Sequence, residues 1–122
     1  MYKDIEYFSR DEMRCKCGCN SSGDEMDKAF LMLLDELRVR LNRPIAVSSG
    51  YRCISHNDKE GGVESSSHVR GFAVDIRIYS SYERWQVINE ALLLGVNRIG
   101  VSRYFVHLDQ DPDKPNFLIW TY

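Results

Sequence analysis

An apolar stripe of helical period runs through residues 24–41 and limits the ways in which this chain can fold. Its members recur at three- and four-residue steps: Met26, Phe30, Leu33, Leu34, Leu37 and Leu41. This spacing places them on one face of an amphipathic helix, and that face must be buried against another layer. Asn42 and Pro44 follow directly, so we expect a helix over 24–41 that ends there.

Strand-like patterns dominate the later part of the chain. Residues 72–78 alternate, with Phe72, Val74, Ile76 and Ile78 on one face and Ala73, Asp75 and Arg77 on the other. Short strands are also predicted at 45–49, 98–101, 104–110 and 116–122, with a turn at PDKP. Because strands and helices do not alternate regularly, we expect an α+β fold. Its sheet should be small and mostly antiparallel, with helices packed on one side.

Two capping boxes mark further helices. Ser9 with Glu12 predicts a short helix over 10–14, and Ser80 with Glu83 predicts a helix that continues to about residue 94. Gly95 should end the second helix, whose buried side is expected to hold Trp85, Ile88, Ala91 and Leu92.

Residues 50–67 show neither a helical nor a strand period, so a long loop is predicted there. Loops of this length without structure of their own are uncommon and often functional.

Composition excludes several classes of protein. The 122 residues suffice for one domain with one core, and the net charge of −2 gives no basic arm for nucleic acid. The apolar run at 30–34 is too short to span a bilayer. The segment MYKDIEYFSRDEM has no apolar signal core, so we expect synthesis in the cytoplasm and delivery by another route. A monomer is expected.

Three of the four cysteines lie in the segment CKCGC, as Cys15, Cys17 and Cys19, and Cys53 is remote. The spacing differs from the two-plus-two pattern of a zinc ribbon. We favour a tight turn with free thiols, or one structural link to Cys53, because no further ligand follows nearby. A structural metal knuckle is the alternative.

Polar side chains lie opposite the core face of two strands. Asp75 lies on the outer face of residues 72–78, and His107 with Asp109 lies opposite Val106 and Leu108. His68 precedes the first of these strands in a serine-rich segment, and a tight turn at the intervening glycine would bring it close.

Two imidazoles and one carboxylate form a zinc site that leaves a fourth position open for water. Spacing alone leaves two alternatives for His68, Asp75 and His107: one shared Zn²⁺, or three unrelated polar residues.

The segments SSGYRC, HN, GG, SSHVRGFAVD and FVHLD, taken together, resemble the zinc D-alanyl-D-alanine carboxypeptidases, a family of peptidoglycan peptidases. The nearest likeness is to the small subfamily A catalytic domains, which share a fold with the hedgehog signalling domain. The resemblance covers nearly the whole chain, which it implies is a single catalytic domain over 1–122. It implies that His68, Asp75 and His107 bind zinc.

The resemblance also implies roles for residues around the metal. Arg52, in the SGYR segment, would hold a substrate carboxylate or polarise the scissile carbonyl; the alternative is an ion pair with Glu60 or Glu64. Ser66 would also contact the substrate. The loop residues Asn57, Gly61 and Gly62 would shape the cleft.

The chain departs from much of the family at the general base. Many members carry His or Glu two or three residues before the last ligand, where this chain has Phe105 and Tyr104. Asp109 could replace that base, or it could orient His107 by a hydrogen bond. Glu64 and Asp111 are weaker candidates.

The implied reaction is hydrolysis of peptide bonds in peptidoglycan stem peptides or cross-links. A carboxypeptidase and an endopeptidase both remain open, and a phage lysis enzyme (endolysin) would fit the expected delivery. The alternative is a zinc-containing module that binds cell walls without catalysis, because the usual base is missing.

Overall fold

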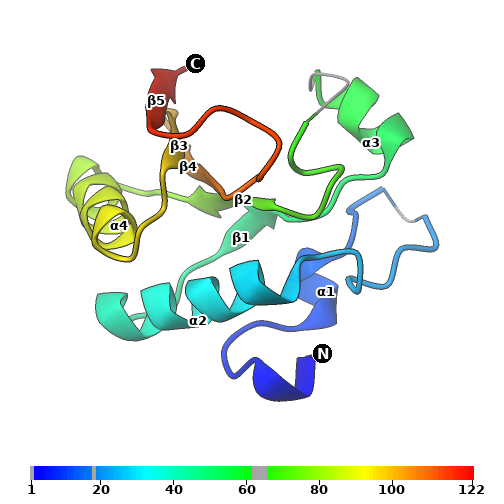
Figure 1. Ribbon diagram of the computed structural model, residues 1–122, viewed down its shortest axis with the longest axis horizontal. Coiled ribbons are helices and arrows are strands. Elements are labelled where there is room, and N and C mark those ends of the chain that lie inside the picture. The colour runs from blue at the N-terminus through cyan, green and yellow to red at the C-terminus, as the bar shows by residue number, and fades with distance from the viewer. Residues whose placement is uncertain (1, 18, 62–65) are drawn as a thin grey trace.

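The computed structural model describes residues 2–17, 19–61 and 66–122 (Figure 1). Its elements in chain order are η1 (Tyr2–Asp4), α1 (Arg10–Met13), α2 (Lys28–Leu41), β1 (Val47–Ser49), α3 (Ile54–Lys59), β2 (Ala73–Arg77), α4 (Ser81–Leu93), β3 (Arg98–Val101), β4 (Phe105–Asp109) and β5 (Leu118–Thr121).

The five strands form one sheet in the order β1-β2-β4-β3-β5. All neighbouring pairs are antiparallel except β3 and β5, which are parallel. The expected α+β class with a mostly antiparallel sheet is therefore confirmed.

The helix α2 confirms the apolar stripe but begins later than predicted. Asp27 caps it, because its carboxylate accepts the N–H of Phe30 at 2.9 Å, and the preceding residues form a turn. Asn42 ends the helix in the left-handed conformation, with φ 54°. The stripe is buried as expected except for the half-buried Leu33, and Leu31 is buried beside it.

The strands β2 and β4 show the predicted alternation. Val74 and Ile76 of β2 and Val106 and Leu108 of β4 join the hydrophobic core beneath the sheet. On the other face of these strands, Asp75, His107 and Asp109 are polar and still buried. The register pairs Asp75 directly with His107, which brings together two side chains that lie far apart in sequence.

The helix α4 begins and ends as predicted, with Ser80 at the N-cap and Gly95 at φ +89° after its end. The expected buried side is partly wrong. Trp85 is 60% exposed and Leu92 is 49% exposed, while Val87 and Ala91 face the core. The contact with α2 and β4 selects a narrower face, so the two larger apolar residues lie outside it.

The prediction of a loop over 50–67 is wrong in part. Residues Ile54–Lys59 form α3, which is capped by Cys53 through its sulfur and the N–H of His56. This helix has no apolar stripe, and only Asn57 within it is buried, so helical periodicity could not reveal it.

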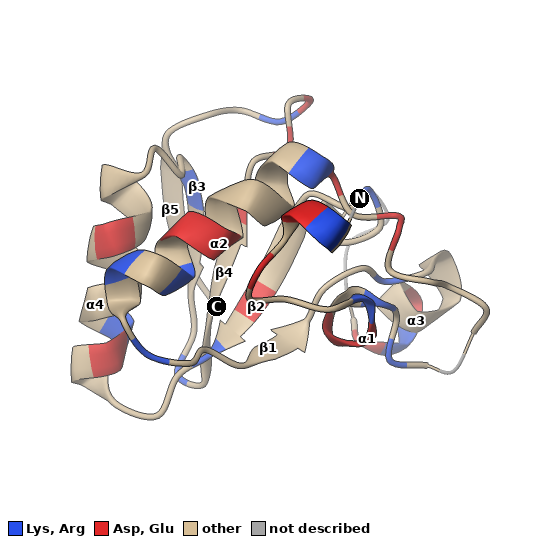
Figure 2. Cartoon of the chain, turned by 90° about the horizontal axis from the view of Figure 1, so that it is seen from below, with Lys and Arg blue, Asp and Glu red and all other residues tan. Residues whose placement is uncertain are grey.

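The helices α2 and α4 lie on one side of the sheet, and the N-terminal segment packs beyond α2 (Figure 1). Ion pairs from Arg40 to Glu90 and from Arg43 to Glu83 join the two helices. Charges of both signs are mixed along them (Figure 2), which agrees with the near-zero net charge. Among the described residues, no helix has the length and apolarity needed to cross a membrane.

Candidate metal centre

His68, Asp75 and His107 come together on the face of the sheet opposite α2 and α4. Each offers one ligand atom, and these atoms lie within 4.8 Å of one another. Asp75 Oδ1 is 3.2 Å from His68 Nε2 and 3.0 Å from His107 Nδ1. All three residues are buried. The structure therefore gathers the three side chains that the sequence singled out.

Local backbone geometry explains how His68 reaches the sheet. The turn of residues 67–71 ends at Gly71, which has φ +80°, a conformation that disfavours any side chain. A Cβ there would lie 2.0 Å from the carbonyl oxygen of Glu25. The predicted tight turn between His68 and β2 is confirmed.

Hydrogen bonds fix which nitrogen of each imidazole faces the centre. His68 Nδ1 lies 2.8 Å from the carbonyl oxygen of Gly50, which can only accept, so Nδ1 carries the proton. His107 Nε2 lies 2.7 Å from Asp109 Oδ2 and donates to that carboxylate for the same reason. The remaining nitrogens, His68 Nε2 and His107 Nδ1, therefore point lone pairs at Asp75.

This donor set fits a divalent metal. Two neutral imidazoles and a carboxylate would repel one another where their lone pairs converge, unless extra protons or a cation lie between them. Nitrogen and oxygen donors of this kind suit Zn²⁺, and three protein ligands are typical of a catalytic zinc. Hydrogen bonds from the outer nitrogens to a carbonyl and a carboxylate are also typical of zinc-binding histidines.

The charges of the metal-free group respond to one another. Burial raises the pKa of Asp75. Without a cation the inner nitrogens of His107 and His68 must carry protons instead, and their hydrogen bonds then outweigh burial and hold that pKa below its usual range. Burial lowers the pKa of His107, but hydrogen bonds to Asp109 and Asp75 outweigh this effect and raise it. The surroundings therefore favour the ionised form of Asp75, and its charge attracts a cation to the position between Asp75, His68 and His107.

Asp109 uses both of its oxygens within the protein. Oδ2 accepts from His107, and Oδ1 accepts from Arg98 Nε at 2.7 Å and from the N–H of Asp111 at 3.2 Å. Its side chain is only 1% exposed. Of the two roles considered for Asp109, this geometry suits orientation of His107 better than proton transfer.

Arg98 was not selected from the sequence. It faces Asp109 across the β3–β4 pair, lies over the ring of Trp120 at 5.2 Å, and is 8% exposed. The alternation of residues 98–101 places it opposite the core-facing Ile99, but only the strand pairing reveals its partner.

Arg52 lies against the candidate metal centre. Its Nη2 donates to Asp75 Oδ2 at 3.2 Å, its Nε to Ser49 Oγ at 2.9 Å, and its Nη1 to Asn57 Oδ1 at 3.4 Å. The side chain is 14% exposed. Arg52 therefore holds the carboxylate of Asp75 while part of its guanidinium faces the cavity.

A cavity of about 700 Å³ opens beside the three-residue group. Arg52 and Ser66, both predicted to contact substrate, line it, and Ser66 Oγ also accepts the N–H of His68 at 3.2 Å. Trp120 and Tyr122 of the C-terminal segment form part of its wall. Sequence patterns did not identify these aromatic residues, because their approach depends on the parallel pairing of β5.

The other residues considered from the sequence lie in varied positions. Phe105 lines the cavity, whereas Tyr104 is 66% exposed. Asp111 is buried and accepts from Ser67 Oγ at 2.9 Å and Arg70 Nε at 3.0 Å. It is not among the described residues that line the cavity.

Described residues in α3 and just after it also line the cavity. His56 lines the cavity, and its Nε2 lies 3.7 Å from a carboxylate oxygen of Glu60. Gly61 also lines it, while Gly62 and Glu64 lie outside the described residues. Among the described residues, Arg52 forms its ion pair with Asp75, and Glu60 lies near His56 instead.

The four cysteines form a second group of side chains. Cys15, Cys17, Cys19 and Cys53 place their sulfurs within 4.8 Å of one another, and all four are free thiols. The preference for a simple turn depended on the lack of a nearby fourth ligand. That premise does not hold in the folded chain, because the fold brings Cys53 close to the CKCGC segment as a fourth sulfur ligand.

No curated protein matches this sequence. Residues 6–109 match the family Peptidase M15, so the match includes all of β2 and β4 and the candidate metal centre. This match confirms the resemblance to zinc D-alanyl-D-alanine carboxypeptidases and supports zinc as the cofactor. The chain therefore belongs to the Peptidase M15 family of zinc metallopeptidases.

Proposed function

We propose that this chain is a single-domain zinc peptidase that hydrolyses peptide bonds in bacterial peptidoglycan, in stem peptides or in their cross-links. The observation that carries the proposal is the convergence of His68 Nε2, Asp75 Oδ1 and His107 Nδ1 at the wall of a large cavity. Zinc held by these residues would supply a water with a pKa near 7 and a positive charge that polarises a peptide carbonyl.

The surrounding residues would keep this group in a reactive geometry. The carbonyl of Gly50 and the carboxylate of Asp109 hold the two imidazoles in the tautomers that direct a lone pair inward. Arg98 fixes the position of Asp109, because its buried guanidinium donates to one of the carboxylate oxygens. We propose that Asp109 acts mainly by positioning His107.

Arg52 supports a substrate that carries a carboxylate. Of the five N–H donors of its guanidinium, three have partners among the described residues, and the group lines the cavity. Lys16 and Lys114 line the same cavity and add positive charge. A stem peptide ending in a free carboxylate would satisfy these cations, which favours a carboxypeptidase over an endopeptidase.

The test uses purified sacculi and two defined muropeptides, one with a pentapeptide stem and one cross-linked dimer. The wild-type protein should release free alanine from the stem or new amino termini from the dimer, and which product forms decides between the two activities. His107→Ala should release neither. His56→Ala removes the one imidazole outside the three-residue group and should still bind zinc.

Other results would overturn the proposal. If the wild-type protein binds zinc and sacculi but releases no product from either muropeptide, the chain is a binding module. If His107→Ala hydrolyses the substrate as fast as wild type, the three-residue group is not the reactive centre.

A further inference from the structure

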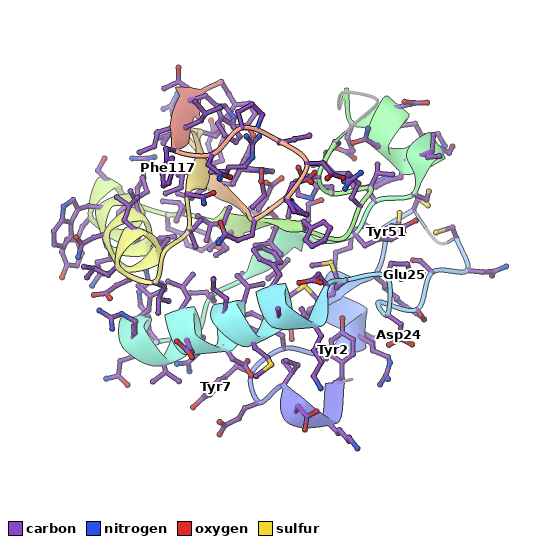
Figure 3. All side chains as sticks on the ribbon, in the orientation of Figure 1. Tyr2, Tyr7, Asp24, Glu25, Tyr51 and Phe117 are labelled. Carbon is purple, nitrogen blue, oxygen red and sulfur yellow. The ribbon has the colours of Figure 1, made fainter. Side chains whose placement is uncertain are left out.

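The four cysteines form a compact group at the junction between the N-terminal segment and the start of α3. Sulfur atoms lie near Tyr51 at this junction (Figure 3). The Sγ atoms of Cys15 and Cys17 are 3.3 Å apart, and those atoms lie 3.7 and 3.5 Å from the sulfur of Cys53. The sulfur of Cys19 completes the group, within 4.8 Å of the other three.

These distances fit a tetrahedron of thiolates around one metal ion. With zinc–sulfur bonds of about 2.3 Å, the sulfurs of a tetrahedral site lie roughly 3.8 Å apart. A disulfide requires a separation near 2.05 Å, about 1 Å shorter than the nearest pair here. Four neutral thiols brought this close would gain little stabilisation from one another, because a thiol is a weak hydrogen-bond donor and a weak acceptor.

Backbone N–H groups point at the sulfurs. The N–H of Cys53 donates to Cys15 Sγ at 3.4 Å, and the N–H of His56 donates to Cys53 Sγ at 3.4 Å. Donors placed in this way stabilise the negative charge of metal-bound thiolates. The N–H of Cys15 donates to Ser21 Oγ at 2.9 Å, so the turn that carries the cysteines is also held.

We propose that Cys15, Cys17, Cys19 and Cys53 bind a second zinc ion in a closed, structural site. With four protein ligands, the ion keeps no open position for water or substrate. Formation of the site exchanges four thiol protons for one Zn²⁺, with no change of oxidation state.

This site would connect the N-terminal turn to the candidate metal centre. Cys53 follows Arg52, whose guanidinium bonds Asp75 and whose N–H donates to the carbonyl of His68 at 3.2 Å. The N–H of Tyr51 donates to the carbonyl of Met13 at 2.8 Å, which adds a second link to α1. A metal at Cys53 would therefore fix the backbone that positions Arg52, without touching substrate.

The experiment measures zinc content and cobalt spectra of the full chain purified under reducing conditions. Wild type should contain about two equivalents of zinc, and His107→Ala and Cys17→Ser about one each. Cobalt-loaded His107→Ala should show thiolate-to-cobalt charge-transfer absorption, because the cysteine group remains intact. Ser55→Ala, an exposed position on α3, is the matched control and should keep both metals.

Titration of the wild-type protein with an organomercurial avoids any dependence on variant folding. Mercuration of the thiols should release about one zinc to a chromogenic chelator, and the other zinc should stay bound. A wild type without thiolate–cobalt absorption and without mercurial-released zinc would overturn the proposal. Because this readout follows the cysteines alone, it is independent of whether the histidine centre hydrolyses peptides.

Discussion

Replacing Asp109 by Asn separates the two roles that this carboxylate could have. Asp109 accepts from two side-chain donors, His107 Nε2 and Arg98 Nε, each at 2.7 Å. Asn has one acceptor oxygen, so one of these donors must face an amide NH₂ group. If the amide NH₂ faces His107, the hydrogen bond that holds the proton on His107 Nε2 is lost. If it faces Arg98, the buried guanidinium loses its hydrogen-bond acceptor, and in either case it loses its anionic partner.

The expected losses follow from this geometry. Removal of a carboxylate that orients a zinc-bound histidine lowers metal affinity about 10–100-fold, or about 1–3 kcal/mol of binding free energy. Breaking the buried pair with Arg98 should lower the free energy of unfolding by about 3 kcal/mol, the low end of the usual range, because Arg98 keeps its contact with Trp120. At saturating zinc, most of the turnover should return.

The assay is a competition between the protein and a chromophoric chelator for zinc, followed by turnover at saturating zinc on the same samples. Asp113→Asn is the matched control, because Asp113 lies on the same C-terminal segment with its side chain 70% exposed. If Asp109→Asn binds zinc as tightly as wild type but loses about 100-fold or more in turnover, Asp109 is the general base and the positioning role is refuted.

Three further changes test the fold. Gly71→Ala should lower the free energy of unfolding by at least about 2 kcal/mol, because φ is +80° and the new Cβ would lie 2.0 Å from a backbone oxygen; urea unfolding measures this loss. Leu34→Ala removes a fully buried side chain and should cost about 2–5 kcal/mol, whereas Met32→Ala on the exposed face of α2 should stay within about 0.5 kcal/mol. Burial raises the pKa of Tyr2 from 10.0 to about 12, so its neutral form is favoured in the folded state. The stability it contributes, at most about 3 kcal/mol, is complete below pH 10 and declines as pH rises toward 12. Tyr2→Phe should lack this decline in urea midpoints measured across that range.

Periodicity predicted the parts of the fold that local sequence controls. The stripe of α2, the alternation of β2 and β4, and the caps at Ser9 and Ser80 all depend on residues close together in the chain. The polar face of β2 and β4 followed from the same alternation, which is why His107 and Asp75 could be selected before their pairing was known.

Local sequence patterns could not predict features that depend on contacts between residues far apart in the chain. The pairing of Arg98 with Asp109 requires the order of the strands, and the approach of Cys53 to the CKCGC segment requires the chain to return from α2. Trp85 was expected inside on helical spacing, but the contact of α4 with α2 decides which face is buried.

The most direct test of the metal centre is anomalous diffraction from crystals of the zinc-loaded protein, with data collected on either side of the zinc absorption edge. We expect an anomalous peak bonded to His68 Nε2, Asp75 Oδ1 and His107 Nδ1 at about 2.0–2.2 Å from each. The absence of a peak at that position, in crystals whose zinc content has been verified, would contradict the account.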